Sequence, residues 1–217
     1  MNYSIIGIGN VGQALAKAFA RKEIEVAIAS RRSAEALAPV AKAIGPTIIA
    51  KSLEDAVKAK IVFLAIPFGT QKDVAKAAEG WHGKIVIDVT NAFGVSPEEL
   101  GELPSSEVVA QAFPGAKLVK AFNHLGADTW AQDPSVKGGR RVVFLSSDDE
   151  SAADKVADLI TQLGFAPVAL GKLTEGGLLI QARGSTWAPL IFQDLFKQEE
   201  LDAHGRATER EVAKARG

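Results

Sequence analysis

The chain has 217 residues, of which 47% are hydrophobic and 24% are charged, with a formal net charge of -1. This composition is typical of a soluble globular protein with one large core. Lys and Arg number 25 and Asp and Glu number 26, so the charge balance gives no reason to expect nucleic acid or an anionic membrane as a partner. The absence of cysteine excludes disulfides, thiolate nucleophiles, iron–sulfur clusters and cysteine zinc sites.

The remaining signals also exclude several classes of protein. The three histidines, His82, His124 and His204, do not stand at metal-ligand spacing, so we expect no metal site. No apolar stretch approaches the roughly 20 residues that a membrane-spanning helix needs. The apolar run from Tyr3 to Ile8 leaves no room for a signal peptide, and we therefore expect a cytoplasmic protein.

Short apolar runs alternate with helical stripes along the chain, an order that builds a mostly parallel sheet covered on both faces. Helices are expected over 11–22, 34–44 and 152–163, with shorter ones after Ser52 and Thr70 and another starting at Ser96. The predicted strands span residues 2–8, 25–29, 47–50, 61–67, 85–89, 118–122, 141–145 and 166–170.

The pattern G-x-G-x-x-G, formed by Gly7, Gly9 and Gly12, lies between the first predicted strand and the first helix. In this position the first glycine permits a tight turn, the second lets a diphosphate approach the backbone, and the third lets the helix pack close to the strand. Asn10 and Val11 then open the helix, whose free N–H groups favour an anion. The sequence therefore predicts a dinucleotide site.

The end of the second predicted strand indicates which dinucleotide binds. NAD enzymes usually present an acid here, which holds the ribose 2′-hydroxyl and repels a 2′-phosphate. This chain instead has Ser30, Arg31, Arg32 and Ser33. Two hydroxyls and two guanidinium groups can bind a phosphate through charge-assisted hydrogen bonds, so NADP is the predicted cofactor.

The nicotinamide should meet residues at the carboxyl ends of the middle strands. Ile66 and Pro67 are expected to contact one face of the ring, while Asn91 and Asn123 could orient its carboxamide or a substrate carbonyl. His124 has two interpretations. It could donate a hydrogen bond or proton beside the transferred hydride, or it could be a loop histidine bonded to backbone.

Four other residues are assigned structural roles. Asp88 is expected to brace the loop that follows its strand, because a carboxylate near the diphosphate would be repelled. His82 and His204 are not expected to contact ligands. Trp187 belongs to a bulky cluster that runs to Phe196, which suggests core packing or a homodimer contact.

The expected fold is therefore a Rossmann-type α/β fold, doubly wound around a mostly parallel sheet, with a short C-terminal helical segment. Residues 1–171 are predicted to form the NADP-binding domain and residues 172–217 the C-terminal segment with a charged tail.

Taken together, these motifs resemble those of the NADPH-dependent reductases of the deazaflavin coenzyme F420, whose fold recurs in the flavin-reducing domain of the six-transmembrane metalloreductases. The matching segments are the GIGNVG turn, Ser30 to Arg32, DVTNAF, KAFNHLGA and Ser146 to Ser151. The resemblance implies a dimeric, NADP-dependent oxidoreductase whose small-molecule partner is a deazaflavin or flavin hydride acceptor.

The sequence differs from the motifs of these reductases in two places, and two other functions remain as alternatives. Such reductases often have a GGTGxxG-type turn and a histidine where Asn123 falls, so the acceptor stays open. An NADP-dependent imine or keto reductase shares the glycine turn, but those families generally append a helical domain of about 100 residues. A non-catalytic NADP sensor would bind the cofactor without turnover.

Overall fold

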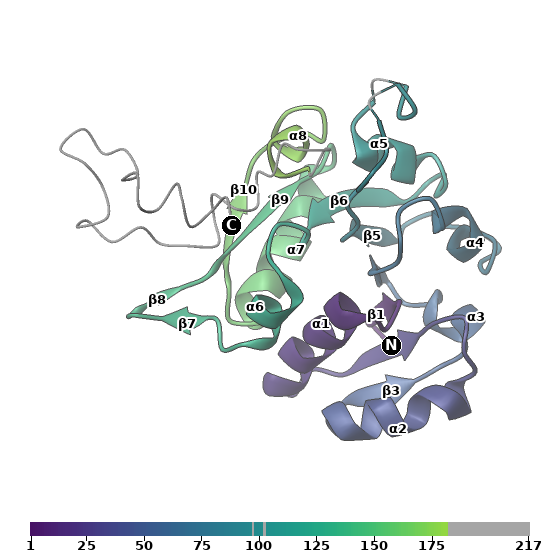
Figure 1. Ribbon diagram of the computed structural model, residues 1–217, viewed down its shortest axis with the longest axis vertical. Helices are drawn as coiled ribbons and strands as arrows, with labels where there is room; N and C mark the ends of the chain where they lie inside the picture. Colours follow the sequence, from purple (N-terminus) through teal and green to yellow (C-terminus); the bar gives the residue numbers. More distant parts are fainter. Residues whose placement is uncertain (97, 102, 182–217) are drawn as a thin grey trace.

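The structure is a computed structural model that describes residues 1–96, 98–101 and 103–181. An eight-stranded sheet in the order β10-β9-β6-β5-β4-β1-β2-β3 crosses the molecule (Figure 1). Its strands are β1 (Tyr3–Ile6), β2 (Val26–Ala29), β3 (Ile48–Ala50), β4 (Ile61–Leu64), β5 (Ile85–Asp88), β6 (Lys117–Ala121), β9 (Val142–Ser146) and β10 (Ala166–Ala169). A separate hairpin is formed by β7 (Ser135–Val136) and β8 (Gly139–Arg140).

The helices cover both faces of the sheet, and each face has its own buried apolar cluster. One cluster includes Leu15 of α1, Leu37 of α2, Trp130 of α6 and Val156 of α7. The other includes residues of the short helices α3, α4 and α5. The bounds are α1 (Asn10–Arg21), α2 (Ala34–Ile44), α3 (Leu53–Ala56), α4 (Gln71–Ala75), α5 (Ser105–Ala110), α6 (Ala127–Ala131), α7 (Glu150–Gln162) and α8 (Gly176–Ile180).

This topology confirms the Rossmann-type prediction. From β3 to β6 the strands are all parallel, and the strand order reverses between β1 and β4. Such a reversal opens a crevice at the carboxyl ends of the strands, where dinucleotides bind. The sheet is mostly rather than wholly parallel because β9 runs antiparallel to β6.

The predicted helix start at Ser96 is wrong, although its local signal forms. The Ser96 hydroxyl accepts a hydrogen bond from the Glu99 N–H, and the Glu99 carboxylate accepts one from the Ser96 N–H, which together make a capping box. No helix follows directly, because the chain turns through Gly101 with φ +63°. The next helix, α5, begins only at Ser105.

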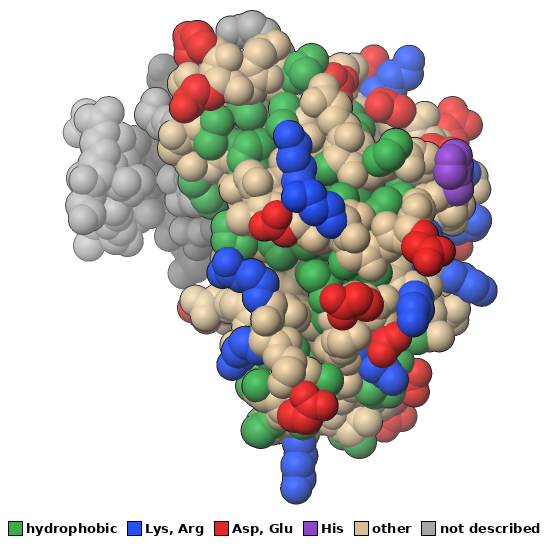
Figure 2. Space-filling model, turned by 90° about the vertical axis from the view of Figure 1, so that its right-hand side faces the viewer, with side chains coloured by type: hydrophobic (Ala, Val, Ile, Leu, Met, Phe, Trp, Pro, Cys, Tyr) green, Lys and Arg blue, Asp and Glu red, His purple; other side chains and the backbone are tan. Residues whose placement is uncertain are grey.

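The predicted domain boundary falls between β10 and α8, the last described helix. The cluster from Trp187 to Phe196, as well as His204 and the charged tail, lies outside the described residues. Within the described part of the chain, no helix is long and apolar enough to cross a membrane. Figure 2 shows one face of the molecule, on which basic and acidic side chains are interspersed.

Candidate functional site: a dinucleotide cleft

The glycine turn joins three neighbouring strands at their carboxyl ends. The Gly7 N–H donates to the Ala29 carbonyl over 2.8 Å, and the Ala65 N–H donates to the Ile6 carbonyl over 2.8 Å. Gly7 has φ +97°, and a Cβ placed there would lie 2.1 Å from the Ala65 carbonyl oxygen. Only glycine fits this turn, because both its backbone conformation and its surroundings exclude a side chain.

The other two glycines of the motif have opposite surroundings. A Cβ on Gly12 would lie 1.9 Å from the Gly7 carbonyl oxygen, whereas a Cβ on Gly9 would meet nothing within 4 Å. Gly12 therefore lets α1 pack against the turn. Gly9 leaves open space in front of the backbone at the start of α1, which is the kind of space that a diphosphate occupies.

Among the three longest described helices, α1 is the one whose N-terminus has no side-chain cap. The helices α2 and α7 are preceded by the N-cap residues Ser33 and Asp149, whose side chains accept hydrogen bonds from backbone N–H groups. The residue that precedes helix α1 is Gly9, which has no side chain for this purpose. The N–H groups of Asn10 and Val11 precede the first helical hydrogen bond and point out of the helix end, where the helix dipole favours an anion.

A cavity of about 260 Å³ lies against this turn. It brings together predicted site residues from three segments: Gly7 and Gly9, Ser30 and Arg31, and Ile66 and Pro67. The lining also contains residues that sequence reasoning missed, namely Leu53, Thr70, Asp73 and Val74. These four lie on or next to the short helices α3 and α4, whose approach to the glycine turn has no local signal in the sequence.

The basic segment after β2 lies at the edge of this cavity. Arg31 and Arg32 are exposed, and neither belongs to the ion pairs found among the described residues. The Ser30 hydroxyl accepts a hydrogen bond from the Arg32 N–H over 3.1 Å, while Ser33 caps α2. The Arg31 side chain lines the cavity, which also contains the Asp73 carboxylate, and Arg32 follows it in the chain. Since neither guanidinium group is in an ion pair of the described residues, both are available to bind a phosphate.

Asn91 and Asn123 come together at the ends of β5 and β6. The Asn91 amide donates to the Asn123 carbonyl over 2.8 Å, and the Asn123 amide donates to the Asn91 side-chain oxygen over 3.0 Å and to the Ile180 carbonyl over 2.7 Å. The Asn123 Oδ1 is buried without a hydrogen-bond partner. Phe122, which has φ +60°, turns the chain at this point; non-glycine residues in this conformation cluster at functional sites.

His124 points into the core rather than into the cleft. It is 1% exposed, and its ring packs edge to face against Trp130 and Phe144. Nε2 lies 3.3 Å from the Val142 carbonyl. Burial lowers the pKa of His124 to about 4, against the opposing effect of that hydrogen bond. Of the two interpretations of this residue, the histidine bonded to backbone describes this environment, which does not suit a proton donor.

Asp88 and Lys120 form a fully buried ion pair beside the asparagines. Lys120 Nζ lies 3.0 Å from Asp88 Oδ2 and also donates to the Thr90 carbonyl. The other oxygen, Asp88 Oδ1, accepts hydrogen bonds from the Thr90 N–H at 2.9 Å and the Thr90 hydroxyl at 2.7 Å. The carboxylate thus braces the loop that carries Asn91, as the sequence predicted, but the role of Lys120 was missed.

The fold and the cleft together define a Rossmann-type dinucleotide-binding protein. The open space at Gly9, the uncapped start of α1, and Arg31 and Arg32, which are in no ion pair of the described residues, fit a nucleotide with an extra phosphate. Comparison with known proteins identifies the class more closely. Residues 2–92 match the family described as NADP oxidoreductase, coenzyme F420-dependent.

The chain is similar to this NADP-dependent oxidoreductase family over its N-terminal part. It is 40% identical to a hypothetical protein from Sinorhizobium meliloti of known structure, with a TM-score of 0.81 over 91% of this chain and 96% of that one. It is 27% identical to a candidate F420-dependent NADP reductase from Arthrobacter sp. FB24, with a TM-score of 0.64 over 80% of this chain and 86% of that one.

Similarity to the metalloreductases is confined to one part of them. The chain is 35% identical to mouse metalloreductase STEAP2 over 125 residues, which are 56% of this chain and 24% of that protein. A reductive aminase from Aspergillus terreus, solved with NADPH and ethyl levulinate, is 18% identical and has a TM-score of 0.56. At this level of identity the aminase shows a shared fold alone.

Proposed function

We propose that the chain transfers a hydride between NADPH and a flavin-type ring, either a deazaflavin such as coenzyme F420 or a flavin. The observation that carries the proposal is the chemistry at the carboxyl ends of β5 and β6. Amide groups of Asn91 and Asn123 lie there, while the nearby titratable groups of Asp88 and His124 are buried and bonded. This edge is suited to bind and orient rings rather than to relay protons.

A flavin-type acceptor matches such a site because it spreads the arriving charge over its own ring system. NADPH, when bound, supplies the hydride from its nicotinamide. The acceptor ring takes up both electrons with the transferred hydrogen, and any further proton comes from solvent. The description of the matching family, which names coenzyme F420, supports this class.

In this proposal the residues of the chain bind and orient the cofactor. Arg31, Arg32 and the Ser30 hydroxyl hold the 2′-phosphate by charge-assisted hydrogen bonds, with Ser33 fixing the start of α2 behind them. The backbone from Gly9 to Gly12, including the N–H groups of Asn10 and Val11, binds the diphosphate. Ile66 and Pro67 provide the apolar contact for the nicotinamide.

Asn123 is the proposed orienting residue nearest to the chemistry. Its buried Oδ1 is without a partner in the described structure, and such an atom is costly unless a bound group donates to it. A carboxamide N–H of the nicotinamide or a ring N–H of the acceptor would satisfy it. Asn91 holds the Asn123 amide in this orientation. The proposal assigns His124 a packing role.

The experiment is an acceptor panel with purified protein and NADPH deuterated at the transferred position, under anaerobic conditions. We expect NADPH oxidation with a deazaflavin, a flavin or both, and retention of deuterium on the reduced deazaflavin carbon. In Asn123→Ala, kcat should fall while the Kd of NADPH changes little. Oxidation by imine or keto substrates alone would support the imine or keto reductase, and binding without any turnover would support a sensor.

The domain boundary is part of the same proposal. The proposed nucleotide-binding domain is residues 1–171, and the proposed homodimer contact belongs to the C-terminal segment 172–217, of which residues 182–217 lie outside the described structure. The hydrogen bond from the Asn123 amide to the Ile180 carbonyl supports a link between this segment and the cleft. Sedimentation of the full chain tests the dimer: a monomer at micromolar concentration contradicts it.

A further inference from the structure

A second and larger cavity lies at the opposite end of the sheet. It has a volume of about 580 Å³, which is within the range of small-molecule sites. Four strands contribute the first residue of each to it: Tyr3 of β1, Ile61 of β4, Ile85 of β5 and Lys117 of β6. We call it the amino-end groove. The length of β1 separates Tyr3 from the glycine turn at Gly7, so the groove is distinct from the dinucleotide cleft.

The floor of the groove is a single row of side chains across the sheet. Tyr3 is the register partner of Ile61, Ile61 is that of Ile85, and Ile85 is that of Lys117. Register partners in a parallel sheet point to the same face. The row therefore begins with an aromatic ring, continues with two branched aliphatic side chains and ends with an ammonium group.

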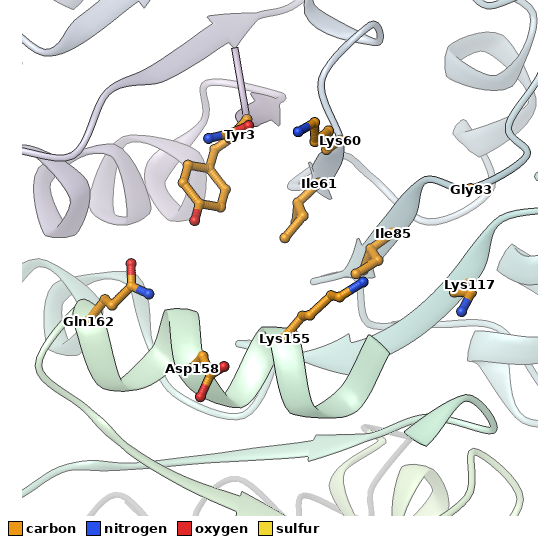
Figure 3. A pocket seen from close by; sticks show the side chains of 10 residues that line it. Tyr3, Lys60, Ile61, Gly83, Ile85, Lys117, Lys155, Asp158 and Gln162 are labelled. Carbon is orange, nitrogen blue, oxygen red and sulfur yellow. The ribbon is translucent and has the colours of Figure 1, made fainter. Parts of the chain in front are cut away.

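Helix α7 forms the opposite wall. Lys155, Asp158 and Gln162 stand three and four residues apart, on one side of the helix. Figure 3 shows Lys155 extending from α7 toward Ile85, while the Gln162 amide and the Tyr3 hydroxyl face each other at the other end of the groove. The wall thus carries a cation, Lys155, and a neutral amide, Gln162, with the Asp158 carboxylate between them along the helix.

The charges concentrate at the Lys117 end. Lys117 Nζ lies 2.8 Å from Asp149 Oδ2, and the hydrogen bond from Lys117, with a further contribution from the Lys155 charge, lowers the pKa of Asp149. Asp149 pairs with Lys117, whereas Lys155 is in none of the ion pairs of the described residues. Lys60, on the rim, takes no part in the ion pairs of the described residues. Asp158 is the acid in the lining itself.

From this arrangement we infer that the amino-end groove is a binding site for a small organic anion with a flat apolar body. The body lies along Tyr3, Ile61 and Ile85, where it is removed from water. A carboxylate, sulfonate or phosphate group at one end meets Lys155, with Lys60 at the rim. An entirely polar anion would leave the apolar floor uncovered, and an uncharged ring would provide no anionic group for Lys155 and Lys60, which are in no ion pair of the described residues.

The test uses anilinonaphthalene sulfonate as the probe, with its fluorescence followed in the full chain saturated with NADP⁺ to fill the dinucleotide cleft. We expect one probe molecule per chain. Lys155→Gln should weaken binding about fivefold and the Lys60→Gln, Lys155→Gln double variant about tenfold, because each removes an ammonium group. Lys42→Gln, an exposed lysine on α2, is the matched control and should bind as the wild type does.

A second measurement locates the probe. In NMR spectra of ¹⁵N-labelled protein, the backbone amide signals of Ile61, Ile85 and Lys155 should shift on addition of the probe, while those of Gly7 and Gly9 should not. The uncharged anilinonaphthalene should bind at least tenfold more weakly. An unchanged Kd in the double variant, equal binding of the uncharged ring, or shifts confined to other residues would overturn the assignment.

Discussion

Lys120 and Asp88 are register partners on β6 and β5, and their side chains form an ion pair of 3.0 Å from which water is excluded. Both side chains are 0% exposed. Removing two charges from water opposes folding, and their mutual attraction offsets this only when the remaining hydrogen-bonding groups are also satisfied. Thr90 provides these partners through its N–H, hydroxyl and carbonyl groups. The pair therefore fixes the loop that carries Asn91.

The first prediction follows from this pair. Lys120→Met leaves Asp88 buried without its counter-charge and should lower the free energy of unfolding by about 3–5 kcal/mol. Adding Asp88→Asn removes the second charge but keeps an oxygen for the Thr90 hydrogen bonds, and should recover at least half of that loss. Urea unfolding of the single and double variants measures both. Equal losses in the two variants would show that the unpaired charge is not the cause.

The second prediction separates the two roles of the glycine motif. Gly12→Ala places a methyl group 1.9 Å from the Gly7 carbonyl, so α1 must move and stability should fall by about 3 kcal/mol or more. Gly9→Ala projects into open space and should cost about 1 kcal/mol or less. In the cleft, however, its methyl group stands where the diphosphate should lie, so NADPH should bind at least about tenfold more weakly. Thermal unfolding and calorimetric titration make the comparison.

Local signals in the sequence were sufficient for much of the fold. The predicted bounds of α2 match the structure, because Ser33 caps its start and a glycine turn follows its end. The box at Ser96 shows the limit of such signals. Its two hydrogen bonds form as expected, but whether a helix continues depends on the following turn and its packing, which a four-residue pattern does not contain.

The residues of the candidate site likewise include some that local sequence signals could predict and some that they could not. The glycine turn was predictable because its residues are contiguous and lie between a strand and a helix. The contact of Asn91 with Asn123 joins residues 32 positions apart, and the pairing of Lys120 with Asp88 depends on strand register. One sequence signal was available for this pairing, since the predicted strands 85–89 and 118–122 are otherwise apolar and each carries a single charged residue. The sequence could not decide whether His124 faces the cleft or the core, because the side chain of a loop histidine can point in either direction.

The third prediction concerns the choice of cofactor. Replacing both Arg31 and Arg32 by Ala should raise the Kd of NADPH at least about tenfold, because charge-assisted hydrogen bonds to the 2′-phosphate are lost. The Kd of NADH should change less than about twofold. Both guanidinium groups are exposed, so the difference between the cofactors should shrink at high salt. Equal weakening of both cofactors would contradict a 2′-phosphate site here.

The final prediction uses the buried imidazole of His124. Its pKa is lowered from 6.5 to about 4 in the folded protein, chiefly by burial. Between these two values the unfolded chain binds a proton that the folded chain does not, so stability is complete above pH 6.5 and falls as the pH drops toward 4. The loss should be on the order of 3 kcal/mol.

Urea unfolding at a series of pH values measures this loss. His124→Phe keeps an aromatic ring between Trp130 and Phe144 but removes the titrating group, so its stability should lack the His124 contribution to the pH slope in this window. His82→Phe is a poor control because the His82 ring lies against Gly115; the Lys42→Gln variant serves better. If wild type and His124→Phe lose stability in parallel between neutral pH and pH 4, the folded imidazole accepts a proton as readily as the unfolded one, and His124 must then be far more accessible than its packing indicates.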